Sequence, residues 1–347
     1  MATPLVRVLE VGVVGVALLT VYCALTTPTV LCLTVLVVLW AVYRWERKRA
    51  AGTVPLNDKH VLITGCDSGF GFAFAKHAHG LGCHVIATVL RPDGQGAKEL
   101  RDVSSSRMTV LPLDVSSDES VRKCLEVVRG MCNGAGLWGL VNNAGQQVVG
   151  DVELTTMSQY LRVANVNLFG MVRTTRAFLP LIRQAKGRIV NVTSVRGRMH
   201  APYQAAYNIT KHGAETFSDI VRLEMRQFGV KVVVIEPGDF SGLKRIEKDF
   251  EEMWAEASDD VKKVYDKEHL DQMLVGFGEG IGCPTMTPVS KAITEALTSE
   301  DPEFRYLVDG SSGLIDKYCM VARVKPFLSD RLFDRILHHV IPYSPRK

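Results

Sequence analysis

Short apolar runs rich in β-branched residues alternate with longer helical patterns through most of the chain. The runs that predict buried strands span residues 60–64, 84–89, 109–113, 140–142, 188–192 and 230–235. The segments with helical spacing of apolar residues span 70–81, 118–132, 160–184 and 205–228. Strands that are apolar on both faces and alternate with helices form parallel sheets covered by helices on both sides. The pattern therefore predicts a single doubly wound α/β domain of the Rossmann type.

The N-terminal region departs from this pattern, because residues 11–43 contain no charged side chain. One helix over this run would reach ~50 Å, well beyond the ~30 Å hydrocarbon core of a bilayer. Pro28 lies near the middle of the run and would kink or break such a helix. Two arrangements stay open: one membrane span over about residues 29–43, or a tight hairpin of two transmembrane helices.

A basic cluster directly follows the uncharged run and consists of Arg44, Arg47, Lys48 and Arg49. Because the cytoplasmic flanks of membrane spans carry the excess of Lys and Arg, the long C-terminal part should face the cytosol. A cleaved signal peptide is the rival interpretation, but the apolar stretch is too long and no small-residue cleavage site precedes the basic cluster. We therefore expect a membrane anchor.

These patterns divide the chain into three parts. Residues 1–55 are the expected anchor with its basic flank, residues 56–310 the Rossmann domain, and residues 311–347 an amphipathic C-terminal extension. Within the Rossmann domain, a largely helical insertion over 243–285 lies where a substrate lid would sit, with a solvated helical pair as the alternative. Residues 329–340 place their apolar side chains on one helix face, which would lie on a membrane, cover a substrate entrance or pack into the core.

Composition excludes several classes of protein. Of the 347 residues, 47% are hydrophobic and 22% are charged, unlike a disordered chain. The net charge is only +4, with basic and acidic residues intermixed, so no nucleic-acid partner is expected. The eight cysteines form no CxxC motif, which argues against a metal site or a disulfide framework and favours reduced thiols.

The first predicted strand runs into a glycine-rich turn, Thr64-Gly65-Cys66-Asp67-Ser68-Gly69-Phe70-Gly71. Its three glycines permit a tight turn, a close approach of the backbone to a pyrophosphate and close packing of the following helix. A lone glycine pattern is a weak signal, but this one follows a strand and opens a helix. We therefore predict that Gly65, Gly69 and Gly71 bind a dinucleotide.

Two residues favour opposite cofactors. The second strand ends at Arg91 instead of the acid that usually binds the ribose of NAD, and an arginine there could hold the 2′-phosphate of NADP. Asp67, inside the glycine turn, would repel that phosphate. The balance favours NAD without excluding NADP.

The next strand ends carry further polar residues. Asp114 follows the third strand, where it can contact an adenine or cap the next helix. Two asparagines, Asn142 and Asn143, close the fourth strand ahead of Ala144 and Gly145. Because buried amides need hydrogen-bond partners, we expect this loop to line the cofactor.

A serine, a tyrosine and a lysine form the expected catalytic set. Ser194 ends the fifth strand, and Tyr207 and Lys211 are spaced to share one face of the next helix. A free tyrosine has a pKa of ~10, and an adjacent ammonium and a bound nicotinamide cation would lower it into the useful range. The serine hydroxyl would orient the substrate oxygen, and Asn167 is placed to hold a water that links Lys211 to solvent.

Taken together, these motifs resemble the NAD(P)-dependent short-chain dehydrogenases/reductases over about residues 56–310, including a Pro-Gly pair after the sixth strand. Stretches such as ITGCDSGFG and FLPLIRQAKGRIVNVTS are similar to the branch that contains hydroxybutyrate, retinol, and type 2 17β- and 11β-hydroxysteroid dehydrogenases. The resemblance implies Asn167, Ser194, Tyr207 and Lys211 as the catalytic set, with Tyr207 as the acid–base, and a homo-oligomer. It also implies further cofactor contacts from Ser68, Phe70, Asn143, Tyr207, Lys211, Pro237 and Gly238.

The two parts of the resemblance disagree on substrate. The core is most similar to D-3-hydroxybutyrate dehydrogenase, whereas the hydrophobic N-terminus is more like that of the steroid and retinol enzymes. We predict a membrane-associated oxidoreductase of steroid or lipid metabolism, which transfers a hydride between NAD(H) and the hydroxyl or ketone of a hydroxysteroid or retinol. The expected location is the endoplasmic reticulum membrane with a cytosol-facing catalytic domain, and a mitochondrial membrane is the alternative.

Two alternative functions stay open. Oxidation of (R)-3-hydroxybutyrate would use Arg196 and Arg198, which follow the catalytic serine and could hold a carboxylate, unless they are surface or subunit-contact arginines. A catalytically idle, dinucleotide-binding membrane scaffold is the alternative of another class. It would predict a broken catalytic set, whereas all four positions are intact.

Overall fold

The computed structural model describes residues 20–22, 28–50, 52–103, 105–240, 246–278, 283, 285–310 and 316–340. The chain divides into a smaller unit, made of residues 1–54 with 299–301 and 313–315, and a larger unit made of the rest. In the smaller unit, helix α2 (Pro28–Ala50) contains the second part of the uncharged run, and most of the first part lies outside the described residues. No helix of the described residues combines the length and the apolar character needed to cross a membrane.

Seven parallel strands form the sheet of the larger unit, in the order β3-β2-β1-β4-β5-β6-β7. Their bounds are β1 His60–Ile63, β2 His84–Val89, β3 Met108–Pro112, β4 Gly139–Asn142, β5 Arg188–Val192, β6 Lys231–Pro237 and β7 Arg305–Val308. The order reverses between β1 and β4, which creates the switch point of a doubly wound sheet. The predicted Rossmann-type fold is therefore confirmed.

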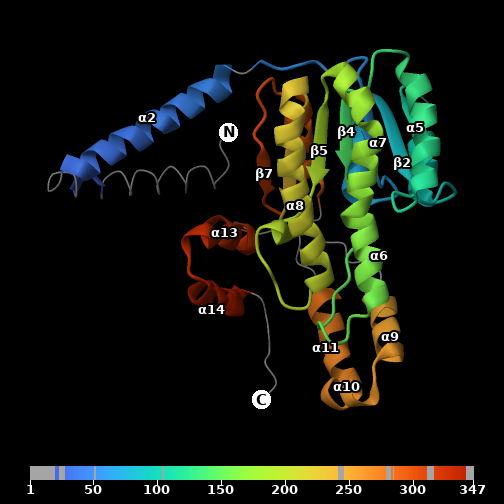
Figure 1. Cartoon of the computed structure of the whole chain (residues 1–347), viewed down its shortest axis with the longest axis vertical. Coiled ribbons are helices and arrows are strands. Elements are labelled where there is room, and N and C mark those ends of the chain that lie inside the picture. The colour runs from blue at the N-terminus through green and yellow to red at the C-terminus, as the bar shows by residue number, and fades with distance from the viewer. Residues whose placement is uncertain are drawn as a thin grey trace. The chain divides into compact units, whose positions relative to one another are not determined.

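Helices cover both faces of this sheet. On one face lie α3 (Gly69–Gly80), α4 (Gln95–Arg101) and α12 (Thr287–Thr298); on the other lie α5 (Asp118–Cys132), α6 (Met157–Asn167), α7 (Phe169–Ala185) and α8 (Ala205–Met225). Figure 1 shows α5, α7 and α8 side by side across the strands. Successive strand residues face opposite cores, so most residues inside the strands are apolar.

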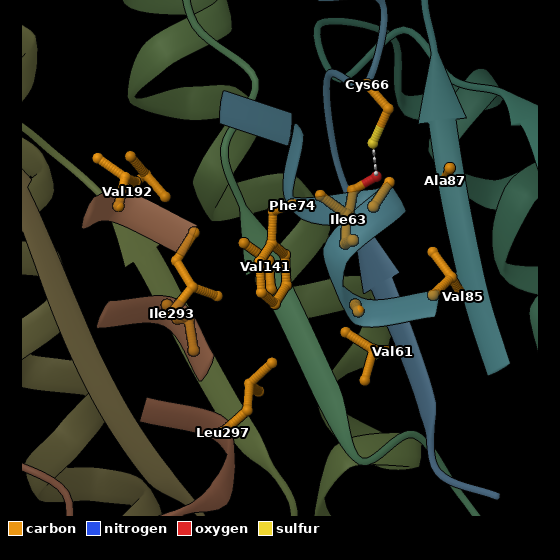
Figure 2. Close-up of a cluster of buried hydrophobic side chains, with 14 of the residues drawn as sticks. Val61, Ile63, Cys66, Phe74, Val85, Ala87, Val141, Val192, Ile293 and Leu297 are labelled. Carbon is orange, nitrogen blue, oxygen red and sulfur yellow. Dashed lines mark hydrogen bonds between the residues drawn. The ribbon is translucent and has the colours of Figure 1, made fainter. Parts of the chain in front are cut away.

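The core beneath α3 and α12 shows this alternation. Val61 and Ile63 of β1 face it, whereas Leu62 between them faces the core on the other side of the sheet. Figure 2 shows Phe74 of α3 among these strand side chains, together with Ile293 and Leu297 of α12. Burial of these apolar side chains, at roughly 25 cal/mol per Å², fixes the sheet that carries the strand ends.

The segment predicted as one helix over 160–184 is two helices, α6 and α7, which meet at Leu168. Helix α6 begins in a capping box, in which the Thr156 hydroxyl accepts from the Gln159 N–H and the Gln159 side chain accepts from the Thr156 N–H. At its end, the Asn167 side chain exchanges two hydrogen bonds with the backbone of Gln146. The break therefore places the polar Asn167 side chain against a loop.

The 243–285 region contains three helices, α9 (Ile246–Glu256), α10 (Asp259–Val264) and α11 (Lys267–Gly278). Their buried residues, including Met253 and Met273, pack with Val163 of α6 and Ala206 of α8. Ion pairs add to this contact, because Arg162 of α6 lies 2.5 Å from the carboxylate of Asp249 in α9. The three helices thus dock beside the start of α8.

Two C-terminal helices, α13 (Lys317–Val324) and α14 (Asp330–Val340), complete the described fold. The apolar face of α14 is buried, with Phe333 and Leu337 packed among Val195 and Met199 of the segment after β5. Of the three roles expected for this amphipathic helix, the structure therefore shows packing into a core. That core includes Val195, the residue after Ser194.

Candidate active site

Four strand ends bring the predicted site residues to one edge of the sheet. Gly65 follows β1, Asn143 follows β4, Ser194 follows β5 and Gly238 follows β6. Since ligands of open parallel sheets bind outside the carboxyl ends of the strands at the switch point, this edge is the candidate site.

The glycine turn after β1 has a backbone conformation that glycine adopts without strain. Gly65 and Gly69 have φ angles of 72° and 63°, in the left-handed region. A Cβ on Gly65 would lie 2.8 Å from the Cα of Ala144, so a side chain would push the two loops apart. At Gly69 no described atom lies within 4 Å of that position. The open N-terminus of α3 therefore fits a phosphate-bearing dinucleotide.

Thr64 joins the glycine turn to the loop after β4, a role that the sequence motif did not single out. Its hydroxyl accepts hydrogen bonds from the backbone N–H groups of Asn143 and Ala144, both at 2.9 Å. The Asn143 amide in turn donates to the carbonyls of Thr64 and Gly65. The side chain of Asn143 therefore holds the glycine turn in its conformation. Two residues later, Gly145 lies beside the Asn167 side chain.

The neighbouring Asn142 has a different role from the one predicted. It is 3% exposed and donates to Asn191 of β5 at 2.8 Å and to Thr175 of α7 at 3.0 Å. The Thr174 hydroxyl donates to the side-chain amide oxygen of Asn142. Its amide is satisfied inside the protein, so the prediction that both asparagines line the cofactor was wrong for Asn142.

Asp67 links the glycine turn to the end of β2. Its two carboxylate oxygens accept hydrogen bonds from the N–H groups of Leu90 and Arg91, both at 2.9 Å. This is the strand end where the adenosine ribose of a dinucleotide binds in such sheets. The structure therefore places the Asp67 carboxylate at the end of β2. The backbone N–H of Arg91 is one of the two groups that bind it.

Three other predicted cofactor residues lie in or after the glycine turn and after β3. Ser68 is the N-cap residue of α3, in extended conformation, and its side chain makes no capping bond. The ring of Phe70 makes an edge contact with Phe240 after β6, at 5.1 Å between centroids. Asp114 accepts from the N–H and hydroxyl of Ser116, so one of its oxygens closes the turn before α5.

The catalytic candidates come from β5 and α8. Ser194 is 6% exposed, and its hydroxyl accepts a hydrogen bond from the Arg196 N–H at 3.1 Å. Lys211 is also buried; its ammonium donates to the carbonyl of Val192 in β5 at 3.1 Å and lies 5.4 Å from the centre of the Tyr207 ring. The Tyr207 ring is half-buried. The ammonium is thus held beside the tyrosine by β5, the strand that precedes Ser194.

Asn167 is linked to the helix that carries Tyr207 and Lys211 by a hydrogen bond to Thr210. Its amide donates to the Thr210 hydroxyl at 3.2 Å and to the Gln146 carbonyl at 2.8 Å. Thr210 precedes Lys211 on α8. Asn167 therefore connects the α6–α7 break to the catalytic helix, and Thr210 is a contact that sequence spacing did not reveal.

The two arginines after Ser194 have different surroundings. Arg198 pairs with Glu236 of β6, which is fully buried, through contacts of 2.5 and 2.7 Å. This internal ion pair leaves Arg198 unsuited to hold a substrate carboxylate. Arg196 is 9% exposed and stacks on Tyr318 of α13, with its guanidinium 4.5 Å from the ring centre.

Asp316 ties the strand ends β6 and β7 to α13. It is 2% exposed, and its oxygens accept from the N–H groups of Asp239, Gly310, Tyr318 and Cys319 at 2.9–3.0 Å. Burial alone would raise the pKa of this carboxyl, but the N–H donors hold it below its ordinary value. The loop Pro237–Gly238 is thereby fixed, as the Gly238 N–H also donates to Val308. No motif in the sequence marked Asp316.

The sequence and the fold are both similar to those of known dehydrogenases. The sequence profile of the family described as short chain dehydrogenase matches residues 59–251. The mitochondrial D-beta-hydroxybutyrate dehydrogenase of Bos taurus is 46% identical over 75% of this chain and 80% of its own. Retinol dehydrogenase 7 of Mus musculus is 37% identical over 87% and 96%. A short-chain dehydrogenase structure from Streptomyces avermitilis superposes with a TM-score of 0.64 at 25% identity, over 82% of this chain and 98% of its own.

Proposed function

Because this chain belongs to the short-chain dehydrogenase family, we propose that it transfers a hydride between NAD(H) and the carbinol carbon of a secondary alcohol. The observation that carries the proposal is the buried Lys211 ammonium, held by β5 beside the Tyr207 ring. Hydride transfer is the chemistry that a bound nicotinamide supplies. The scaffold alternative has no support in this geometry, because the groups for proton transfer are assembled.

Each residue of the set has a distinct task. In oxidation, the Tyr207 oxygen takes the hydroxyl proton while the carbinol hydrogen leaves as hydride; in reduction both steps reverse. The positive charge of Lys211 stabilises the deprotonated tyrosine. Ser194 donates to the substrate oxygen and orients it. Asn167, through Thr210, positions the segment of α8 that carries Lys211 and supports the proton path to solvent.

NAD is the proposed cofactor in preference to NADP. The cradle that would hold it consists of Gly65, Ser68, Gly69, Phe70, Gly71, Asp114, Asn143, Ala144, Gly145, Tyr207, Lys211, Pro237 and Gly238. The preference is supported by the Asp67 carboxylate at the end of β2, since a 2′-phosphate there would meet a negative charge.

The first substrate candidate is a lipophilic alcohol of the hydroxysteroid or retinol class. Its support is the apolar character of the helices docked next to Tyr207, where Met253, Leu270 and Met273 pack with Ala206. It is also supported by the match to a retinol dehydrogenase over nearly the whole length of that relative.

The second candidate is a 3-hydroxy acid. One observation favours it specifically: Arg196, buried two residues from Ser194, with a charge that interacts with the Tyr207 hydroxyl. The hydroxybutyrate dehydrogenase relative, at 46% identity, agrees with it.

We further propose that the protein is a membrane-associated homo-oligomer with its catalytic domain in the cytosol. The support is the uncharged sequence of residues 11–43 and the basic cluster behind it. The endoplasmic reticulum is the proposed membrane, and a mitochondrial membrane is the alternative.

NADH formation by the purified full chain tests the function. The substrates are a panel of hydroxysteroids, retinol and (R)-3-hydroxybutyrate, each offered with NAD and with NADP. We expect NADH formation with at least one alcohol and a higher kcat/KM with NAD. Absence of cofactor reduction with every alcohol, in a protein that binds NADH, would favour the scaffold function.

A further inference from the structure

A buried carboxylate lies next to the expected catalytic residues and takes no part in the proton and hydride transfers. Glu215 comes one turn after Lys211 on α8, so Tyr207, Lys211 and Glu215 occupy the same side of this helix. One of its oxygens accepts a hydrogen bond from the Thr193 hydroxyl at 2.6 Å. Thr193 is buried and directly precedes Ser194. The carboxylate therefore binds the residue next to the catalytic serine.

The turn after Ser194 packs against the same carboxylate. It spans Val195–Gly197, and one of its backbone N–H groups donates to the Ser194 hydroxyl. A Cβ on Gly197 would lie 2.9 Å from the Cγ of Glu215 and 3.1 Å from the carbonyl oxygen of Lys211. The missing side chain thus lets the turn approach α8 closely. Glu215 lies against the chain both before and after Ser194.

The orientation of the carboxylate is fixed from its other side by Arg305 of β7. The Arg305 Nε donates to the second oxygen of Glu215 at 3.1 Å, and its Nη2 donates to Asp219 at 2.6 Å. Each oxygen of Glu215 therefore has a donor, and the guanidinium compensates its charge. Charge-assisted hydrogen bonds of this kind hold a buried carboxylate in one orientation.

Helix α8 bonds the end of β5 at two successive residues. The Lys211 ammonium donates to the carbonyl of Val192, and the Glu215 carboxylate accepts from Thr193. The next residue of the chain is Ser194. Because Lys211 and Glu215 are one turn apart on the same helix, these two bonds set the position of the serine hydroxyl relative to the tyrosine on that helix.

We propose that Glu215 is a positioning residue: through Thr193 it holds the Ser194 hydroxyl where this group and the Tyr207 hydroxyl reach the same substrate oxygen. This inference rests on the proposed function of the same site. Reaction rates are sensitive to such placement, because a displacement of about 1 Å can cost on the order of 10²-fold. Since Glu215 acts on the serine only through other protein groups, its loss should lower kcat and leave the affinity for cofactor nearly unchanged.

The Thr193 hydroxyl is the first target of the test. Thr193→Val removes this hydroxyl and keeps a branched side chain, whereas Thr193→Ser keeps the hydroxyl. With the alcohol of the panel that has the highest kcat/KM, we expect kcat to fall about 10- to 100-fold in Thr193→Val and less than about threefold in Thr193→Ser. The KM for the alcohol and the Kd for NADH should change less than about threefold in both variants.

Glu215→Gln tests the other partner, with Asp219→Asn as its matched control. Asp219 lies one turn further along α8 and also binds Arg305, but within the described part of the chain it makes no hydrogen bond to β5. We expect kcat to fall about tenfold in Glu215→Gln, because a neutral amide binds both of its neighbours more weakly, and less than about twofold in Asp219→Asn. Both variants break an ion pair with Arg305, so the loss of that pair cannot explain a difference between them.

The double variant Thr193→Val/Glu215→Gln tests whether the two residues act together. If Glu215 acts through Thr193, the double variant should have the kcat of Thr193→Val alone, within about threefold. Losses of kcat that multiply would contradict this route.

A purely structural role of Glu215 gives a different result. It predicts lower melting temperatures in Thr193→Val and Glu215→Gln with an unchanged kcat at temperatures where both are folded, and this outcome would overturn the positioning role while the dehydrogenase function stands. Equal losses of kcat in Glu215→Gln and Asp219→Asn would overturn it as well. If the unmodified protein oxidises no alcohol, the proposed function itself has failed and the positioning role falls with it.

Discussion

At the scale of single residues, the surroundings of a charge decide its role more than its place in a motif. Arg196 and Arg198 are two positions apart and were interchangeable in the sequence, as both could have held a carboxylate. The structure distinguishes them because only Arg198 forms an ion pair with Glu236 of β6. Such a partner comes from a strand almost forty residues later, so spacing around Ser194 carries no information about it.

The pairing of Arg198 with Glu236 predicts a pH-dependent loss of stability in Arg198→Met. Burial raises the pKa of the Glu236 carboxyl to about 7, against ~4.3 in an unfolded chain, and removing Arg198 raises it further. The folded variant then holds a proton that the unfolded chain lacks, so its stability rises as pH falls. Urea unfolding should show a loss of ~3 kcal/mol at about pH 8 and a smaller loss at about pH 6.

Adding Glu236→Gln to that variant should remove most of the pH dependence, because the remaining buried carboxyl beside it, Glu215, keeps its partners Thr193 and Arg305. Equal losses at the two pH values in Arg198→Met would show that Glu236 does not carry the effect.

Asp67 allows a second residue-scale prediction, on cofactor choice. Asp67→Asn removes the negative charge at the end of β2 and keeps one acceptor for the N–H groups there. The ratio of kcat/KM for NAD to that for NADP should fall about tenfold, which corresponds to ~1.4 kcal/mol. Arg91→Gln is the companion variant and should not lower the ratio. An unchanged ratio in Asp67→Asn would mean that the carboxylate does not face the ribose.

At the scale of elements, the regular parts of the fold followed from periodicity and the irregular parts did not. Strands β1 to β6 were predictable because both faces of each are apolar. β7 was not predicted; it is a four-residue edge strand that begins with Arg305 and Tyr306, so its sequence shows no apolar β-branched run. The break between α6 and α7 was missed because an Asn–Leu pair has no strong helix-breaking signal; it depends on the bonds of Asn167 to Gln146.

The same reasoning explains how much of the site was predictable. Gly65 and Gly69 were recognisable because their backbone geometry demands glycine, and Ser194, Tyr207 and Lys211 because their spacing combines one strand end with one helix face. Thr64, Thr210 and Asp316 act through contacts between distant segments, and nothing in their local sequence distinguishes them from ordinary polar residues. Whether the predicted contacts are used in catalysis stays a prediction.

The docking of α13 gives an element-scale prediction. Asp316→Ala removes the acceptors of four backbone N–H groups, so α13 and the ends of β6 and β7 should lose hydrogen-exchange protection. The free energy of unfolding should fall by ~2 to 3 kcal/mol near neutral pH.

The pH dependence of that loss has a definite sign. The pKa of Asp316 is lowered in the folded chain, so its contribution is present above ~3.9 and disappears as pH falls through the folded value. Arg323→Ala, which breaks an exposed ion pair between α13 and Asp309 after β7, should cost less than about 1 kcal/mol. An equal effect of the two variants would contradict the special role of Asp316.

At the scale of the whole molecule, the fold informs on the reaction, whereas the N-terminal sequence informs on location. The larger unit accounts for the chemistry, and the uncharged residues 11–43 support the proposed membrane location. An anchor by itself does not select a lipophilic substrate, because it can hold an enzyme for a water-soluble acid on a membrane equally well. Arg196 is therefore more informative on substrate than the anchor.

The membrane proposal predicts the behaviour of the full chain in sealed microsomes. The protein should stay in the pellet after alkaline carbonate extraction, because removing the apolar run from the bilayer is unfavourable. Protease added outside should digest the catalytic domain, as the basic cluster orients it to the cytosol. Release into the supernatant would contradict the anchor, and protection from protease would contradict the orientation.

The central claim is that Tyr207, supported by Lys211, moves the proton of the reacting hydroxyl. The most direct measurement is alcohol-dependent NADH formation by Tyr207→Phe, compared with the unmodified chain, alongside NADH binding followed by fluorescence. The phenyl ring preserves the packing of α8 and removes only the hydroxyl. We expect kcat to fall by at least ~10²- to 10⁴-fold while the Kd for NADH changes little. Turnover at the unmodified rate in Tyr207→Phe would contradict the account.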